Sequence, residues 1–364
     1  MKYHPILFPI SFACMAITAT AATLVVSPAG KVGATGTADA PFAGLAEAAD
    51  RAQPGDIIRI AGGTYKQEQP IHLGTSGTAT APIRIEPTDT KRVLFDFSEQ
   101  KFEQRLSGIV VAGDYWQIVG LEVVGASRSG IQVTGHHNII ERCRTHENQG
   151  TGVDLSAPAS HNLVLNCDSY RNVDRPNRGE NADGFGAKYK IGPGNVFRGC
   201  RAWENADDGF DLWKAPFPVR IEYCVAYRNG LNLWGIERFT GNGNGFKLGG
   251  DFIPAAHVVV GCLVMDQPKN GFDQNNNTDV LTVEQCTAIR CMMGFSFTLA
   301  TTNGQPNVFR DNVGWNAPGM FVEGTVLERN LWSSDHRPQI PPTIVESTPV
   351  TRKPLAPRIS TKSP

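Results

Sequence analysis

The sequence predicts an all-β chain wound into a single parallel β-helix, a solenoid in which each coil contributes several short strands. Three observations support this fold class. Short β-branched or aromatic runs alternate with turn residues, and the 364 residues include 38 Gly and 24 Pro. Helical periodicity is strong only near the N-terminus. Cysteines recur at intervals of 24 residues, which indicates one repeat per coil. The pairs at this interval are Cys143 and Cys167, Cys200 and Cys224, and Cys262 and Cys286.

The N-terminus has the features of a secretory signal. Lys2 precedes the mostly apolar run Ile6–Ile17, and Ala19-Thr-Ala is a small-residue cleavage site. The apolar run is shorter than the roughly 20 residues that an uncleaved membrane anchor needs. We therefore predict a signal peptide over residues 1–22 and a secreted, membrane-free mature chain.

The mature chain is predicted to be one domain over residues 23–332, followed by an irregular Pro-rich tail over 333–364. After Pro41, apolar residues at helical spacing over 42–52 predict a short helix that caps the open N-terminal end of the solenoid. Strands are predicted around this helix and up to residue 124. Their bounds are Leu24–Val26, Ile57–Ile60, Ile83–Ile85, Val93–Phe97, Ile109–Val111 and Ile118–Val124.

Aligning the repeats on their cysteines brings other positions into columns. Equivalent residues of successive coils lie about 4.8 Å apart, so a column in the alignment becomes a ladder in space. The Asn found five positions after each of four cysteines predicts a ladder of stacked amides at a turn. The cysteines themselves are predicted to be small buried apolar residues, with disulfides as the alternative. The Asn column comprises Asn148, Asn172, Asn205 and Asn229.

The overall charge indicates no polyelectrolyte partner. The 34 basic side chains nearly balance the 35 acidic ones, for a net charge of −1. This balance gives no reason to expect binding to nucleic acid or to an acidic membrane surface. We expect a monomer whose function resides in a local site.

The charged residues of three repeats converge on one such site. The triplets Phe-Asp-Leu and Phe-Lys-Leu alternate apolar and charged residues, which directs Asp211 and Lys247 out of the core in the same column. Asp183 and Asp208, each one position before the Gly of its repeat, share a second column, and Asp207 adjoins Asp208. The register therefore predicts four neighbouring carboxylates with Lys247 at their rim.

Four carboxylates within a few ångströms repel one another, so either some are protonated or a cation lies among them. Oxygen ligands without a nearby histidine favour a hard cation, and flexible carboxylate geometry favours Ca²⁺ over Mg²⁺. The alternatives are a solvated polar turn for the acids and a surface ion pair between Asp211 and Lys247 for the lysine.

Two repeats are longer than the others and carry insertions at Asn172–Glu180 and Leu231–Gly241. Both insertions fall in the same half of the coil, so we expect them to form walls of a groove beside the acidic residues. Basic residues nearby could bind a polyanionic chain in that groove, or could simply be solvated. These candidates are Lys188, Lys190, Lys214 and Arg238.

Residues 24–332 resemble polysaccharide lyase family 9, a pectate lyase family with a right-handed parallel β-helix. The resemblance rests on Asn-Ala-Asp-Gly-Phe at 181–185, Asp-Asp-Gly-Phe-Asp-Leu at 207–212 and Asn-Gly-Phe-Lys at 244–247. It implies that Lys247 is the proton-abstracting base. It also implies a set of calcium ligands, namely Asp183, Asp207, Asp208 and Asp211.

The resemblance further implies β-elimination on an acidic polysaccharide such as polygalacturonate. Calcium would bind a uronate carboxylate and acidify the hydrogen on C5, and Lys247 would remove that proton as the bond from C4 to the glycosidic oxygen breaks. The product would carry a 4,5-double bond. Because a lysine normally titrates near about 10.4, Lys247 needs either a lowered pKa or an alkaline medium.

Two other functions remain open on the sequence alone. In a β-helix glycoside hydrolase, Asp183, Asp207 and Asp208 would act as acid and base on water. That function would leave Lys247 without a role. The products of hydrolysis would lack the ultraviolet absorbance of unsaturated uronides. In a non-catalytic carbohydrate-binding solenoid, calcium would only staple the coils together, and replacing an Asp would lower the melting temperature.

Overall fold

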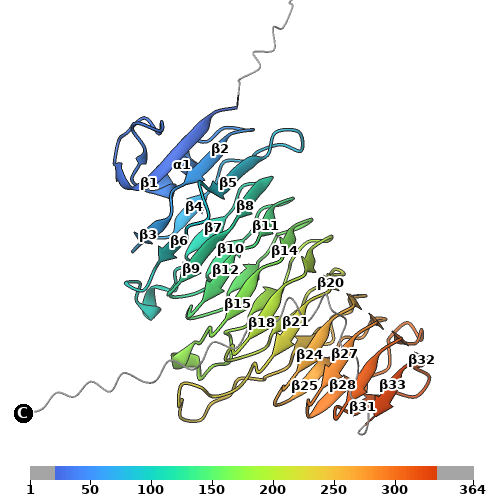
Figure 1. Ribbon diagram of the computed structural model, residues 1–364. Coiled ribbons are helices and arrows are strands. Elements are labelled where there is room, and N and C mark those ends of the chain that lie inside the picture. Colours follow the sequence, from blue (N-terminus) through green and yellow to red (C-terminus); the bar gives the residue numbers. More distant parts are fainter. Residues whose placement is uncertain (1–20, 334–364) are drawn as a thin grey trace, which may run out of the picture.

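The computed structural model describes residues 21–333, which form a right-handed parallel β-helix, and this confirms the predicted fold class (Figure 1). The predicted signal peptide lies outside the described residues except for its last two positions, and so does the predicted tail except for Ser333. The coils follow one another along a single axis from β1 to β33.

Within residues 21–333 the strands form three parallel sheets, called here sheets A, B and C, of 12, 11 and 10 strands. Each strand pairs with the equivalent strand of the neighbouring coil. Sheet A contains β1 (Thr23–Lys31), β2 (Ile57–Ile60), β5 (Ile83–Pro87), β8 (Trp116–Val119), β11 (Ile139–Glu141), β14 (Leu163–Leu165), β17 (Val196–Arg198), β20 (Arg220–Glu222), β23 (Val258–Val260), β26 (Thr282–Glu284), β29 (Val308–Arg310) and β32 (Val326–Glu328).

Sheet B contains β3 (Gly63–Lys66), β6 (Val93–Asp96), β9 (Leu121–Val124), β12 (Arg144–His146), β15 (Asp168–Tyr170), β18 (Arg201–Trp203), β21 (Val225–Tyr227), β24 (Leu263–Met265), β27 (Thr287–Ile289), β30 (Val313–Trp315) and β33 (Leu331–Ser333). Sheet C contains β4 (Ile71–Leu73), β7 (Ile109–Val111), β10 (Ile131–Val133), β13 (Val153–Leu155), β16 (Phe185–Ala187), β19 (Phe210–Asp211), β22 (Phe246–Lys247), β25 (Asn270–Asp273), β28 (Met293–Phe297) and β31 (Gly319–Phe321).

The predicted strands of the first coils are largely confirmed, with one error. The segment Ile118–Val124 is not one strand, because Gly120 adopts φ +70° and turns the chain from β8 in sheet A to β9 in sheet B. A positive φ costs glycine little because it has no Cβ. Strands β3 and β4 were not predicted, and β1 extends five residues beyond the predicted end at Val26.

Helix α1 (Leu45–Arg51) lies at the N-terminal end of the solenoid. It buries Leu45, Ala48 and Ala49 and contacts β1, β2 and β4. The helix begins later than the predicted residue 42, because Phe42 forms β-bridges with Val26 and Lys31 and is fully buried. In residues 21–333 no helix has the length and apolar character required to cross a bilayer.

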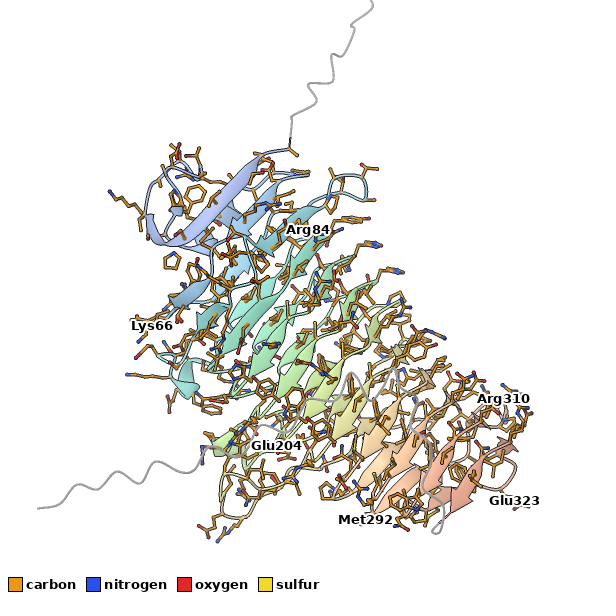
Figure 2. All side chains as sticks on the ribbon, in the orientation of Figure 1. Lys66, Arg84, Glu204, Met292, Arg310 and Glu323 are labelled. Atoms are coloured by element: carbon orange, nitrogen blue, oxygen red, sulfur yellow. The ribbon has the colours of Figure 1, made fainter. Side chains whose placement is uncertain are left out.

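The solenoid interior is built from ladders of equivalent side chains. Five phenylalanines of sheet C stack with ring centroids 4.8–4.9 Å apart. The six cysteines of the 24-residue repeat are all buried and free, as is Cys291, which confirms the apolar reading over disulfides for the described residues. Charged side chains such as Lys66 and Arg310 lie at the periphery (Figure 2). The stacked phenylalanines are Phe185, Phe210, Phe246, Phe272 and Phe295.

The predicted amide ladder is confirmed at the turn between sheets B and C. The Nδ2 of Asn148 donates to Oδ1 of Asn172 at 2.9 Å, and the same contact links Asn172 to Asn205 at 2.8 Å and Asn205 to Asn229 at 2.9 Å. The glycine column lies against this ladder. A Cβ on Gly209 would lie 3.0 Å from Nδ2 of Asn229 and 2.6 Å from the Gly245 carbonyl oxygen, so only glycine fits.

Candidate metal centre

Strand register in sheet C places the charged residues of the site. Phe185, Phe210 and Phe246 pair across β16, β19 and β22 and point into the core. The residue after each Phe points outward, so Asp211 on β19 lies directly opposite Lys247 on β22. This pairing is the one that the alternation of apolar and charged residues predicts.

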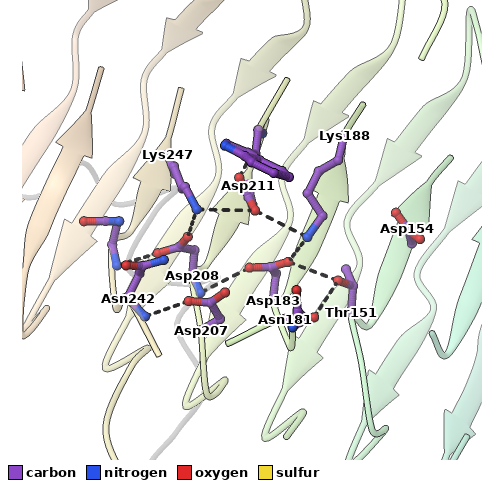
Figure 3. Close-up of polar contacts among 12 residues, drawn as sticks. Thr151, Asp154, Asn181, Asp183, Lys188, Asp207, Asp208, Asp211, Asn242 and Lys247 are labelled. Carbon is purple, nitrogen blue, oxygen red and sulfur yellow. Dashed lines mark hydrogen bonds and ion pairs between the residues drawn. The ribbon is translucent and has the colours of Figure 1, made fainter. Parts of the chain in front are cut away.

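Three carboxylates form the tightest part of the site. Asp183, Asp207 and Asp208 each offer an oxygen that lies within 4.8 Å of the other two, and the side chains are buried (Figure 3). They precede β16 and β19, at the end of the turn that also holds the amide ladder. Asp211 lies beside this trio and turns one oxygen toward two lysines.

Backbone and side-chain donors orient the carboxylates. Oδ1 of Asp207 accepts a hydrogen bond from the amide of Asn242 at 2.7 Å, and Oδ1 of Asp208 accepts one from the amide of Asn244 at 2.8 Å. The hydroxyl of Thr151 donates to Oδ2 of Asp183 at 3.0 Å. Oδ2 of Asp208 is buried and accepts no hydrogen bond. A polar atom in that condition is costly unless a further ligand binds it.

Lys247 extends over the same carboxylates. Its Nζ lies 3.2 Å from Oδ2 of Asp208, in a geometry that forms an ion pair without a hydrogen bond, and 3.7 Å from Oδ2 of Asp211. The Lys247 side chain is 11% exposed. The ion pair between Asp211 and Lys247 that the sequence offered as an alternative is present, but it is buried instead of lying at the surface, and the amine contacts a second acid, Asp208.

Burial and mutual repulsion shift the titration of the acids. Burial, and then repulsion from Asp211 and Asp183, raise the pKa of Asp208 to about 7 even though Lys247 lowers it. Burial and the charge of Asp208 raise the pKa of Asp207 well above its usual value. Burial by itself would lower the pKa of Lys247, but the surrounding carboxylates outweigh it and raise that pKa. These shifts disfavour the ionised forms of Asp207 and Asp208 and favour the protonated form of Lys247.

The donor set fits a hard divalent cation. Calcium binds oxygen ligands at about 2.3–2.6 Å, so two ligands on opposite sides of one ion lie about 5 Å apart. The 4.8 Å limit on the oxygens of Asp183, Asp207 and Asp208 is compatible with that spacing. Oδ2 of Asp208 accepts no hydrogen bond and is paired only through charge with the Lys247 amine at 3.2 Å, so it can serve as a ligand atom.

The four basic candidates have different surroundings. Lys188 contacts Asp183 and Asp211 at 2.6 and 3.3 Å, which makes it part of the charged cluster. Lys214 pairs with Asp251 at 2.6 Å and lies over the ring of Trp213. Lys190 is exposed. The side chain of Arg238 is 77% exposed on the second insertion, beside Glu237.

The two insertions pack against each other beside the acids. The amide of Thr240 in the second insertion donates to the carbonyl of Arg178 in the first at 3.0 Å. A small apolar cluster joins Val173, Ala182 and Ala206 to side chains of the second insertion. The chain leaving the second insertion then places the Asn242 amide on Asp207. The backbone that follows the second insertion thus orients one carboxylate directly.

Comparison with known proteins identifies the family. The sequence matches the family described as "Pel9A-like, right handed beta helix region" over residues 24–312. The chain belongs to this family, polysaccharide lyase family 9. It is therefore a polysaccharide lyase. Pectate lyase L of Dickeya dadantii is 40% identical over 289 residues, which are 77% of this chain and 68% of that protein.

Two further comparisons extend the family assignment. Pectate lyase PEL9 of Emericella nidulans is 34% identical over 356 residues, which are 89% of this chain and 86% of that protein. The crystal structure of pectate lyase Pel9A is similar with a TM-score of 0.81 and 38% identity, and the match covers 86% of this chain and 80% of that one. The family assignment therefore rests on sequence and on fold together.

The outward column of this family 9 chain holds two acids that the sequence prediction missed. Asp154 on β13 and Asp273 on β25 occupy the same column as Asp211 and Lys247. Both follow the Gly of their repeat by two positions, which is the rule that located Lys247. Applying that rule to every repeat would have found them. Nothing in the motifs indicated the contacts of Lys188.

Proposed function

We propose that this protein is a secreted, calcium-dependent pectate lyase that cleaves polygalacturonate, or a related uronate polymer, by β-elimination. One observation carries the proposal. An amine, that of Lys247, lies 3.2 Å from a buried carboxylate oxygen that has no hydrogen-bond donor. A base beside a cation site is what abstraction of a proton next to a metal-bound carboxylate requires. The pectate lyase relatives support the choice of substrate.

Each residue of the site has a defined task in this proposal. Asp183, Asp207, Asp208 and Asp211 hold the calcium. Bound calcium supplies positive charge that stabilises the carboxylate and the negative charge developing at C5 of the uronate. Lys247 in its neutral form accepts the C5 proton. The electrons of the C5–H bond form the C4–C5 double bond, and the glycosidic oxygen leaves from C4 and takes a proton from solvent.

The protonation state of Lys247 sets the pH dependence of this reaction. The carboxylates raise the pKa of Lys247, which disfavours the neutral base, whereas a divalent cation among them opposes that shift. Since only the neutral amine accepts a proton, the rate should rise as pH increases toward the pKa of the lysine in the calcium-loaded enzyme. The enzyme is therefore expected to work best at alkaline pH.

The substrate and location follow from charge and from the N-terminus. Lys190 and Arg238 are exposed and can attract a polyanionic chain, while Lys214 is engaged with Asp251 and Lys188 with the acidic cluster. The signal features of residues 1–22 support secretion. We propose that the enzyme acts as a monomer, without nucleic acid or membrane partners.

A single assay tests the activity. Polygalacturonate is incubated with the protein, and the ultraviolet absorbance of unsaturated uronide is followed with calcium and with a chelator. We expect absorbance to rise only with calcium. Lys247→Ala should lower the rate by about 10²–10⁴-fold and still bind calcium, as measured by calorimetry. Lys66→Ala, which removes an exposed lysine on β3 of sheet B, is the matched control and should keep its rate.

Two outcomes would contradict the proposal. A normal rate for Lys247→Ala would remove the assigned base. New reducing ends without ultraviolet absorbance would indicate hydrolysis instead of elimination. If no product of either kind forms from polygalacturonate, a panel of other uronate polymers is assayed next. Product from one of them would indicate a different substrate, and product from none would indicate a non-catalytic protein.

A further inference from the structure

We infer that Lys188 is a positioning residue of the metal centre, a built-in counter-ion that reduces the negative charge of the four carboxylates and fixes Asp183 and Asp211. This inference rests on the proposed calcium site and adds a residue to it. It differs from a role in which Lys188 contacts only the substrate. The following contacts carry it.

Lys188 lies on the opposite side of Asp211 from Lys247 (Figure 3). Its Nζ donates to Oδ2 of Asp183 at 2.6 Å and lies 3.3 Å from Oδ2 of Asp211. The side chain is only 12% exposed, and that of Asp183 is fully buried. A buried carboxylate that loses its charged partner is strongly destabilised, so Lys188 contributes to the stability of the metal-free site.

The sheet is adapted to let Lys188 reach these acids. Gly186 fills the outward position of β16, between Asp154 and Asp211 in the column. A Cβ there would lie 3.4 Å from Cε of Lys188 and 3.4 Å from Oδ1 of Asp154. Cε of Lys188 would therefore be in van der Waals contact with a Cβ at position 186.

The charges of the site explain what the extra lysine achieves. Four carboxylates and one divalent cation leave two negative charges when Lys247 is neutral. Counting Lys188 leaves one. An anionic uronate must then approach this site, and each remaining negative charge opposes it. Conversely, the ammonium of Lys188 repels the calcium ion. The counter-ion thus weakens calcium binding and favours binding of the polyanion.

Calorimetric calcium titration of the full chain at pH 8 tests the inference. Lys188→Met removes the charge and keeps most of the apolar stem, and Lys188→Gln keeps a hydrogen-bond donor without charge. Both should bind calcium more tightly, by about tenfold or more. Both should melt at a lower temperature without calcium, and calcium should raise their melting temperature by more than it raises that of the parent. KM for polygalacturonate should increase.

A control variant and the results that would overturn the role of Lys188 can be stated separately. Lys190→Met removes an exposed lysine two residues away and should leave the calcium Kd and the metal-free melting temperature unchanged. If the Lys188 variants change KM alone, or bind calcium more weakly, the counter-ion role is overturned while the proposed function stands. If Lys188→Met does not fold, Lys188→Gln decides. Failure of the parent to bind calcium contradicts the proposed function and this inference together.

Discussion

The amide ladder and the acidic cluster lie next to each other, and both arise from the stacking of equivalent residues in successive coils. The polar groups of the ladder satisfy one another, whereas those of the cluster repel one another. In the ladder, Oδ1 of Asn172 accepts hydrogen bonds from both the amide and the side chain of Asn148, and each coil repeats this arrangement with the next. In the cluster, Asp183 and Asp208 also stack coil on coil, but their side chains carry like charges and Oδ2 of Asp208 accepts no hydrogen bond.

The difference separates a structural column from a functional one. A buried ladder whose members satisfy one another is complete within the chain and contributes to stability. A buried column of like charges is incomplete, so its members depend on something added, here Lys188 and Lys247 together with the proposed cation. Substitutions in the two columns should therefore have opposite effects on stability and activity.

The largest expected effect is that of Asp208→Asn. The amide oxygen can still accept the hydrogen bond from Asn244, but one ligand charge is lost, so lyase activity should fall by about 100-fold or more. The metal-free variant should melt no lower than the parent, because a repelling carboxylate is gone. Calorimetry and the absorbance assay measure the two effects. A marked loss of metal-free stability would show that Asp208 is a structural residue.

Breaking the amide ladder should act on stability instead. Asn148→Ala leaves the amide of Ala126 without its acceptor and Oδ1 of Asn172 without one donor, both in buried positions. The free energy of unfolding should fall by about 2–3 kcal/mol, as measured by urea denaturation. Calcium should raise the melting temperature of the variant and of the parent by the same increment. If calcium raised the melting temperature of the variant by more than that of the parent, the amide ladder and the acidic cluster would be energetically coupled.

Substitutions in a column of mixed charge on sheet B should have effects between those in the amide ladder and those in the acidic cluster. Glu122 is buried between Arg92 and His146. Burial opposes its ionisation, but the hydrogen bonds from His146 and Arg92 lower the pKa of Glu122 to about 2. Burial alone would lower the pKa of His146, yet Glu122 and Glu147 raise it above 6.5. The column is thus self-neutralising, unlike the acidic cluster.

Its contribution to stability should depend on pH in a defined window. The folded pKa of Glu122 is depressed, so its contribution is present above about pH 4.5 and is lost as pH falls toward 2. The folded pKa of His146 is raised, so its contribution is complete below 6.5 and is lost as pH rises through the raised value. Glu122→Gln should cost about 1–2 kcal/mol near pH 5.5. Urea denaturation across pH checks this, and a cost that does not vary with pH contradicts it.

The sequence predicted the columns well because the repeat length determines the register. The cysteines set the period and the glycines set the position within each coil, so Asp211 and Lys247, each two positions after its Gly, were predicted to meet across neighbouring strands, and the structure pairs them. The first coils contain no such marker, so β3 and β4 were missed. The contacts of Lys188 depend on its conformation and on the missing side chain at Gly186, which no spacing rule encodes.

The smallest effect is expected in a third kind of column, the solvated one. Charges of alternating sign follow each of the six repeat cysteines by four positions, and Arg228 lies 3.3 Å from Glu204 with their side chains 47% and 26% exposed. Water and salt screen such pairs, so Arg228→Ala should change the free energy of unfolding by no more than about 0.5 kcal/mol, and by less at high salt. Urea denaturation at two salt concentrations measures the change. A decrease in the free energy of unfolding above about 1 kcal/mol would mean that exposed ion pairs also stabilise the register of the coils. The difference between the columns would then depend on whether their groups are paired, and not on whether they are buried.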